Sequence, residues 1–306
     1  MIKKSHKKLY ISLITFIAIY TSFSFIISER YIHNGNLDVN NNLYNKALIN
    51  YDKAKILNPF NSNINVKMAQ TYEKTKDDKN AIKEYKKAIF KKFDDIDLRT
   101  NIINLLLRNG QIAETAKYFL FTNKKIFENK NFSIAVSKAL FIFGNKDKAN
   151  NLLKNIDSLE ASTQRSIFNY LDENYEEAKR EIIKKTDIDN SYKKAIIKET
   201  ENLEFYKVSV AESLNEINQP YFGQIILEKM LKDKKESRDV YLYLGNSYLI
   251  QNNIEKAREN LEKAKEKDLI FGLTYYLLAQ VNFRENKDTE GLLNLKQAKN
   301  YGFKNN

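Results

Sequence analysis

The chain has 306 residues, 42% of them hydrophobic and 12% aromatic, and only 8 Gly and 2 Pro, which favours an all-helical fold over sandwich and α/β folds. The absence of cysteine excludes disulfides, thiolate metal sites, a cysteine nucleophile and a lipid-bearing cysteine, and the two histidines, His6 and His33, make no metal-ligand cluster. The formal net charge of +12 comes largely from lysine pairs interleaved with acidic residues, so we expect no nucleic-acid partner.

The first predicted elements are a basic leader, residues 1–8, and the uncharged stretch Leu9 to Ile27. As a helix this stretch would be about 28 Å long, which matches the hydrocarbon core of a bilayer. We therefore expect residues 9–27 to form a transmembrane signal anchor. The alternative is a cleaved signal peptide and a secreted protein. The apolar run is long for that alternative, and its candidate cleavage site, Ser22-Phe23-Ser24, lies inside the run.

The charges around this stretch predict an orientation. Four lysines precede it, whereas Glu29 and Arg30 after it cancel. By the positive-inside rule, the amino terminus would be cytoplasmic and everything after residue 28 would lie across the cell membrane. We expect a single-pass protein with an extracytoplasmic repeat region.

A 34-residue unit repeats after the anchor, with copies starting at residues 28, 62, 96 and 130, and again at 204, 238 and 272. In the clearest copy, the apolar spacing predicts helices from Asp239 to Gln251 and from Ile254 to Lys267, separated by the polar break Asn252-Asn253. Gly245 and Ala257 are expected where the two helices cross, because larger side chains there would push the helices apart.

These large and small residues at helical spacing resemble the tetratricopeptide repeat (TPR). The resemblance implies an all-α fold, a right-handed superhelical solenoid of about eight antiparallel helix pairs, preceded here by the transmembrane helix. We expect an N-terminal block of about four repeats at 28–158, an irregular repeat and joint at 159–203, and a C-terminal block of three repeats at 204–306.

Several segments depart from the family pattern. The first helix of the first copy contains Asn34-Gly35-Asn36 and further asparagines, which are poor helix formers. In the third copy Thr115 and Thr122 replace the usual alanines, and residues 186–190 are rich in turn formers. At the carboxyl end, Leu292, Leu293 and Leu295 form either an apolar edge for self-association or a partly exposed terminal helix.

Family members generally hold peptides on the concave face, which is lined by positions 2, 5, 9 and 12 of the first helices. In the last three copies these positions are Phe205, Val208, Glu212, Asn215, Asp239, Leu242, Asn246, Leu249, Leu273, Tyr276, Gln280 and Phe283. Apolar anchors among amides suit an extended segment, and the alternative is that the apolar members only pack between neighbouring first helices. The carboxylate clamp of some family members is not expected, because Asn246 has Leu242 beside it and Leu277 in the next copy.

No catalytic or cofactor motif is found in the sequence. The acidic clusters at Asp77-Asp78, Asp94 to Asp97 and Asp187/Asp189 fall at predicted turns, where Asp is expected to cap helices. We therefore expect a membrane-tethered protein-interaction scaffold without cofactors or catalysis. The alternative is a self-assembling subunit or accessory component of a cell-envelope complex.

Overall fold

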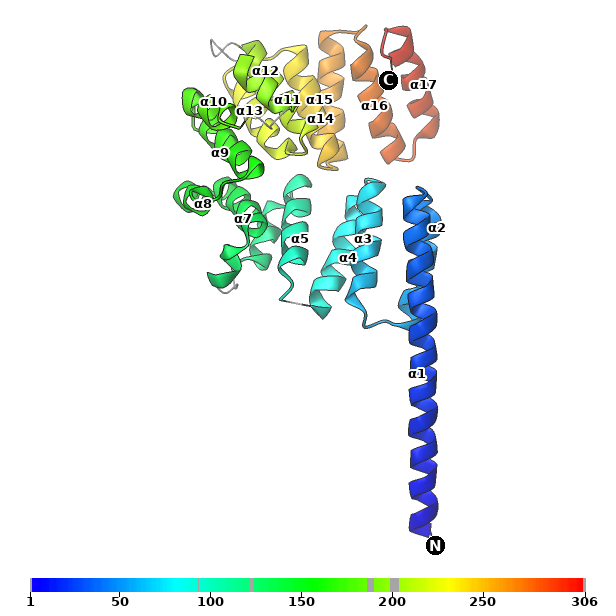
Figure 1. Ribbon diagram of the computed structural model, residues 1–306. Helices are drawn as coiled ribbons and strands as arrows, with labels where there is room; N and C mark the ends of the chain where they lie inside the picture. The colour runs from blue at the N-terminus through cyan, green and yellow to red at the C-terminus, as the bar shows by residue number, and fades with distance from the viewer. Residues whose placement is uncertain (1, 93, 121–123, 186–189, 199–203, 305–306) are drawn as a thin grey trace. The chain divides into compact units, whose positions relative to one another are not determined.

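The computed structural model describes residues 2–92, 94–120, 124–185, 190–198 and 204–304, apart from the side chains of residues 2–13 and 124. The described residues form seventeen α-helices, two short 3-10 helices and no strand, so the expected all-helical fold is confirmed (Figure 1). The chain divides into two compact units, Met1–Leu105 and Leu106–Asn306. The joint predicted at 159–203 lies within the second unit.

The first unit consists of antiparallel helices packed in sequence. Its helices are α1 Ile2–Asn40, α2 Tyr44–Leu57, α3 Ser62–Lys74 and α4 Asp78–Lys91, followed by α5 Ile96–Arg108, which crosses the division between the units. Helix α1 packs along α2, and α3 packs along α4. Their shared core contains Ile32, Ala47, Tyr51, Ala54, Ile64 and Met68.

Helix α1 is continuous from Ile2 to Asn40, so the predicted anchor and the first helix of the first copy are one helix. The asparagine-rich stretch does not break it, because this stretch is packed against α2. A Cβ on Gly35 would lie 2.5 Å from Cε1 of Tyr51, and the Tyr51 hydroxyl donates to Oδ1 of Asn36 at 2.9 Å. Close packing and this hydrogen bond outweigh the low helix propensity.

Among the helices whose residues are described, none is long and apolar enough to cross a membrane. The predicted anchor, Leu9 to Ile27, begins among the side chains that lie outside the description.

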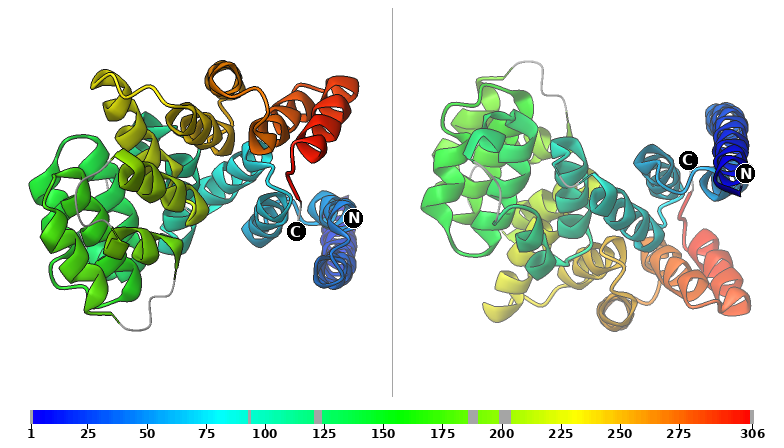
Figure 2. Two further views of the ribbon diagram at one scale, coloured as in Figure 1. Left: turned by 90° about the horizontal axis from the view of Figure 1, so that it is seen from above. Right: turned by 90° about the horizontal axis from the view of Figure 1, so that it is seen from below.

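The second unit continues the series of helix pairs. Its elements after α5 are α6 Ile112–Thr115, η1 Ala116–Tyr118, η2 Lys124–Glu128, α7 Lys130–Ile142, α8 Lys146–Leu153, α9 Leu159–Leu171, α10 Tyr175–Ile183, α11 Ser191–Lys198, α12 Glu204–Glu216, α13 Pro220–Lys232, α14 Arg238–Ile250, α15 Ile254–Lys267, α16 Gly272–Arg284 and α17 Asp288–Asn300. Figure 2 shows these pairs following one another in chain order, from green to red.

The predicted period is confirmed by the helix starts. First helices begin at Ser62, Ile96 and Lys130, and again at Glu204, Arg238 and Gly272, each 34 residues after the one before. Helix α9 begins at Leu159, the position given above for the start of the irregular repeat. Repetition at this interval means that each pair buries its apolar face against its neighbours.

The same turn joins the two helices of every pair. One residue in it has positive φ: Asn42, Lys76, Gly110, Gly144, Glu173, Asn218, Asn252 and Asn286. The next amide donates to the carbonyl five residues earlier, for example Asn253 N to Tyr248 O at 2.9 Å. This is the Schellman arrangement, which satisfies the last carbonyls of the first helix and reverses the chain.

The helix crossing predicted in the clearest copy is confirmed. A Cβ on Gly245 would lie 2.7 Å from Cγ of Leu261, so the absence of a side chain there lets α14 and α15 approach. Ala257 is completely buried. The capping roles expected for Asp77 and Asp95 are also confirmed, since their carboxylates accept from the amides of Asn80 and Leu98 at 3.1 Å.

Two segments differ from the repeat or lie beyond the description. The second helix of the third copy is short: α6 covers Ile112–Thr115 and continues only as the 3-10 turn η1. Thr122 and residues 186–189 lie outside the described residues, so the expectations for them are not addressed. Helix α11 lies in the irregular joint. It is a single helix between the pair α9 and α10 and the pair α12 and α13.

Candidate functional site

The groove residues expected in the last three copies divide into buried and accessible side chains. Phe205 is 70% exposed, whereas Val208, Asn215, Leu242 and Leu249 are all buried. Leu242 and Leu249 belong to the main core of the second unit. Val208, Leu242 and Leu249 are therefore core residues whose side chains present little surface to a ligand.

Asn215 has a structural role between α12 and α14. Its Nδ2 donates to the carbonyl of Tyr243 at 3.2 Å, and its Oδ1 accepts from the Ser247 hydroxyl at 2.8 Å. Both ends of the amide are thus used inside the protein. A buried amide satisfied in this way fixes the spacing of two neighbouring first helices.

Two further groove residues, Tyr276 and Phe283, contact the last helix or the segment after it. The ring of Tyr276 stacks on that of Phe303 with their centroids 4.4 Å apart. A Cβ on Gly291 would lie 2.5 Å from Cε1 of Phe283, so the Phe283 ring packs against α17. Among the predicted groove residues only Phe205 is largely exposed, and the remaining half-buried members are Glu212, Asp239, Asn246, Leu273, Tyr276, Gln280 and Phe283.

Glu212 lies in an acidic setting. Burial raises the pKa of its carboxyl group, and the nearby carboxylates of Glu216 and Asp239 raise it further, while a hydrogen bond from Tyr243 acts in the opposite direction. Burial likewise raises the pKa of the Tyr243 hydroxyl, and its bond to Glu212 adds to the effect. Arg238 does not compensate Glu212, because its guanidinium pairs with Asp239 at 2.7 Å and with Asp268 at 2.8 Å.

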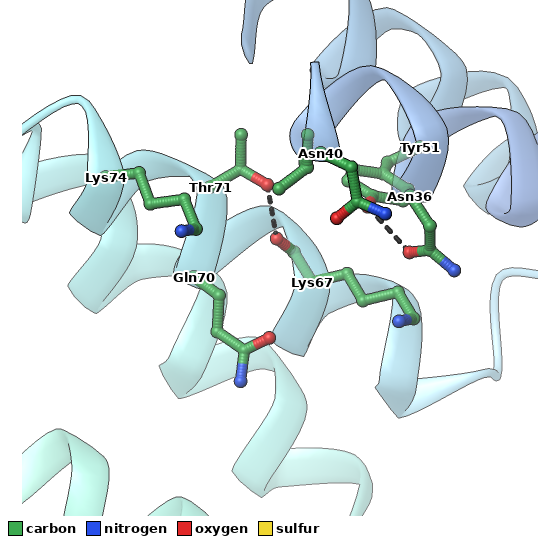
Figure 3. A pocket seen from close by; sticks show the side chains of 8 residues that line it. Asn36, Asn40, Tyr51, Lys67, Gln70, Thr71 and Lys74 are labelled. Atoms are coloured by element: carbon green, nitrogen blue, oxygen red, sulfur yellow. Dashed lines mark hydrogen bonds between the residues drawn. The ribbon is translucent and has the colours of Figure 1, made fainter. Parts of the chain in front are cut away.

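A second site, not predicted from the sequence, lies between α1 and α3. It is a pocket of about 270 Å³ lined by Asn36, Val39, Asn40, Tyr51, Lys67, Gln70, Thr71 and Lys74 (Figure 3). All but Tyr51 come from first helices of the first two pairs. Figure 3 shows Lys67, Gln70 and Lys74 extending from α3, with Lys67 beside Asn36 of α1.

Some polar groups of this pocket are already engaged. Asn36 accepts the hydrogen bond from Tyr51, and the Thr71 hydroxyl donates to the carbonyl of Lys67 at 2.7 Å. The nearby carboxylate of Asp38 is used elsewhere, since Asn50 donates to it at 2.7 Å and Lys46 lies 3.4 Å from it.

The lining therefore has a definite chemistry. It contains the ammonium groups of Lys67 and Lys74 and the amides of Asn40 and Gln70, and none of its residues is acidic. Such a surface favours a ligand with carboxylate groups and backbone amides.

The rule applied to the last three copies would have located this pocket in the first two. Asn36 and Gln70 stand at position 9 of their copies, and Val39 at position 12. The residues that line the pocket are mostly polar, so the spacing of apolar residues in the sequence did not reveal it. Among the described residues, no three His, Cys, Asp or Glu side chains are grouped to hold a metal ion.

No protein-family model and no curated protein matches the sequence. Among solved structures, the chain is similar to a tetratricopeptide repeat protein from Parabacteroides merdae, with 14% identity over 90% of this chain and 93% of that one and a TM-score of 0.34. It is similar to MamA from Desulfovibrio magneticus RS-1, with 18% identity over 56% and 94% and a TM-score of 0.32. YrrB, described as a TPR protein with an unusual peptide-binding site, shows 16% identity over 71% and 92% and a TM-score of 0.31. TM-scores this low do not indicate what this chain binds.

Proposed function

We propose that this chain is a membrane-tethered scaffold that binds a segment of a partner protein and performs no catalysis of its own. The observation that carries the proposal is the polar pocket between α1 and α3, on the first helices of two consecutive pairs. Stacked helix pairs present such helices side by side, which provides an extended surface for a peptide.

The lining of the pocket selects the kind of segment. The amides of Asn40 and Gln70 can each donate to and accept from a peptide backbone. Lys67 and Lys74 add two positive charges that no lining carboxylate neutralises. We therefore infer a segment that carries Asp or Glu side chains or a free carboxyl terminus, held in an extended conformation.

Tethering is supported by the sequence and by the surface of α1. The apolar run from Leu9 to Ile27 has the length of a bilayer span and follows a lysine-rich leader. In its described part, most large apolar side chains are more than half exposed: Ile14, Phe16, Ile17, Ile19, Tyr20, Phe23, Phe25 and Ile26. A continuous apolar surface of this extent is costly in water and suits lipid.

The binding proposal is tested by charge reversal in the pocket. The full chain in detergent is mixed with two pools of short labelled peptides, one rich in Asp and Glu and one rich in Lys. The acidic pool should be retained, and Lys67→Glu with Lys74→Glu should abolish its retention. The matched control is Lys79→Glu with Lys83→Glu, which makes the same charge change on exposed positions of α4 away from the pocket.

Equal retention of both pools, or loss of binding in the control as well, would contradict the proposal. If cross-linking in cells instead recovers the chain itself as the main product, the self-assembling subunit replaces the scaffold.

A further inference from the structure

One edge of the first unit carries large apolar side chains that nothing in the described structure covers. Ile56 is 79% exposed, Phe60 is 87% exposed and Phe90 is 88% exposed. They come from the last turn of α2, the connection between α2 and α3, and the last turn of α4. Single exposed apolar residues are ordinary on protein surfaces, but three at one edge call for a partner.

A lysine ties these segments together. The ammonium group of Lys91, next to Phe90, donates to the carbonyl of Pro59 at 2.5 Å and to Oδ1 of Asn65 at 2.7 Å. Pro59 directly precedes Phe60 in the chain. The end of α4 and the connection between α2 and α3 therefore belong to one surface, which we call the aromatic edge: Ile56, Phe60, Phe90 and Lys91.

The aromatic edge lies beside the end of the apolar run of α1. The Ser28 hydroxyl donates to the carbonyl of Ala54 in the last turn of α2 at 3.0 Å, and Ser24 is only 8% exposed. Helix α1 thus begins to pack against α2 at Ser24, whereas the described large apolar side chains of α1 before Ser24 are exposed. Figure 1 shows α1 continuing past the ends of α2 and α4 toward the amino terminus. The edge is consequently level with the point where the uncharged run gives way to Glu29 and Arg30.

The edge also borders an excess of positive charge. Lys55 lies 3.1 Å from the buried carboxylate of Glu84, and Lys87 pairs with the same carboxylate. Lys91 joins this group through Asn65, so one carboxylate serves three ammonium groups. Burial lowers the pKa of Lys91, and the charge of Lys55 lowers it further, while the charge of Glu84 acts in the opposite direction. The neighbouring Lys92 is neutralised by Asp95 at 2.8 Å.

We propose that the aromatic edge rests in the headgroup layer of the anionic bilayer that holds the amino-terminal part of α1, with Phe60, Phe90 and Ile56 at the boundary of the acyl chains and Lys91 beside lipid phosphates. This inference rests on the tethering proposed above. Aromatic rings and lysines in one plane next to a span are the composition that membrane interfaces favour. Docking would fix the orientation of the first unit on the membrane, because α1 alone is a single attachment that permits tilting and rotation.

The absence of tryptophan from the chain allows a direct test. Single variants Phe60→Trp and Phe90→Trp place a fluorophore at the edge, where the high exposure of both rings makes the substitutions harmless to folding. The full chain is reconstituted into vesicles of phosphatidylcholine and phosphatidylglycerol that contain brominated lipids. Leu43→Trp, in the exposed turn between α1 and α2, is the control at the other end of the pair.

Phe16→Trp, within the apolar run, reports on the tether itself. We expect strong quenching at Phe16→Trp, clear quenching with a blue-shifted emission at Phe60→Trp and Phe90→Trp, and none at Leu43→Trp. Replacing phosphatidylglycerol by phosphatidylcholine should weaken quenching at the edge variants and leave Phe16→Trp unchanged.

The outcomes separate the two proposals. Quenching at Phe16→Trp without quenching at Phe60→Trp and Phe90→Trp overturns the edge and leaves the tether intact. A blue shift at the edge without quenching would show that protein, either a second copy or a partner, covers it and would equally overturn the inference. No quenching at Phe16→Trp would refute both.

Discussion

Two glycines at helix crossings allow a comparison of the same mutation against different neighbours. In Gly223→Ala the new Cβ would lie 2.8 Å from the backbone carbonyl oxygen of Ala211 and 3.3 Å from Oδ1 of Asn215. In Gly245→Ala the nearest atoms are Cγ and Cδ2 of the Leu261 side chain, at 2.7 and 2.9 Å. Both changes gain about 1 kcal/mol of helix propensity.

The two positions differ in how easily the atoms next to the new Cβ can move. At Gly245 the two nearest atoms belong to the Leu261 side chain, which can adjust at lower cost than a helix backbone, although the amide nitrogen of Leu261 at 3.2 Å limits the adjustment. The carbonyl of Ala211 belongs to helix α12, and Asn215 is held by Tyr243 and Ser247, so α13 must move away from α12 as a whole. Overpacking costs about 1–3 kcal/mol, with the upper part of the range expected where backbone must shift.

We therefore expect Gly223→Ala to lower the free energy of unfolding by about 1–2 kcal/mol and Gly245→Ala by less than about 1 kcal/mol. Gly245→Leu, which cannot be accommodated by Leu261, should cost a few kcal/mol. Urea titration followed by far-UV circular dichroism measures all three, with amide exchange to locate the loosened helices. If Gly223→Ala is as stable as the natural chain, or Gly245→Ala is the more damaged of the two, the packing argument is refuted.

Three further substitutions test the turns and the buried charges. Lys76→Gly relieves a positive φ and should stabilise the chain to urea by about 0.5–1 kcal/mol, whereas a loss would show that the left-handed turn carries no strain. Burial raises the pKa of Glu84, but hydrogen bonds, including that from Lys55 at 3.1 Å, lower this pKa more. The folded-state pKa therefore lies below the unfolded one, so the charged Glu84 stabilises the protein above the unfolded pKa, and this stabilisation is lost as the pH falls through the folded pKa. Glu84→Gln should therefore cost about 1–3 kcal/mol at pH 7, measured by urea, and flatten the loss of stability in acid; an unchanged acid profile would contradict this. Burial raises the pKa of Glu212, so its stabilising contribution exists below the unfolded pKa and is lost as the pH rises through the folded pKa. Glu212→Gln should therefore raise the melting temperature at pH 7 but not at pH 4, and a lower melting temperature at pH 7 would contradict this prediction.

The residues of the sequence determine the helix pairs because the relevant forces are local. Apolar spacing of 3.6 residues defines each helix, and the turn residues between helices determine where the chain reverses. Hence α15 has the predicted bounds, Ile254–Lys267, and α14 differs from its predicted bounds by one residue at each end. The polar break Asn252-Asn253 supplies the residue with positive φ that ends α14.

Local reasoning was less informative where packing decides. The weak helix formers around Gly35 are helical because Tyr51 packs against them, an interaction between residues 16 positions apart. Helix α6 ends at Thr115, and the threonine in place of the usual alanine did not by itself predict this early end. Pattern alone does not distinguish a side chain that faces a ligand from one that faces the next helix.

The candidate site illustrates the same division. The sequence by itself determined the repeat period and the positions of most of the helices. Only the tertiary structure decided that Leu242 and Leu249 are buried in the core and that Lys67, Gln70 and Asn40 line a common pocket. The physical reason is that burial and pocket shape depend on the distance and angle between successive pairs, which are set by contacts among residues far apart in the chain.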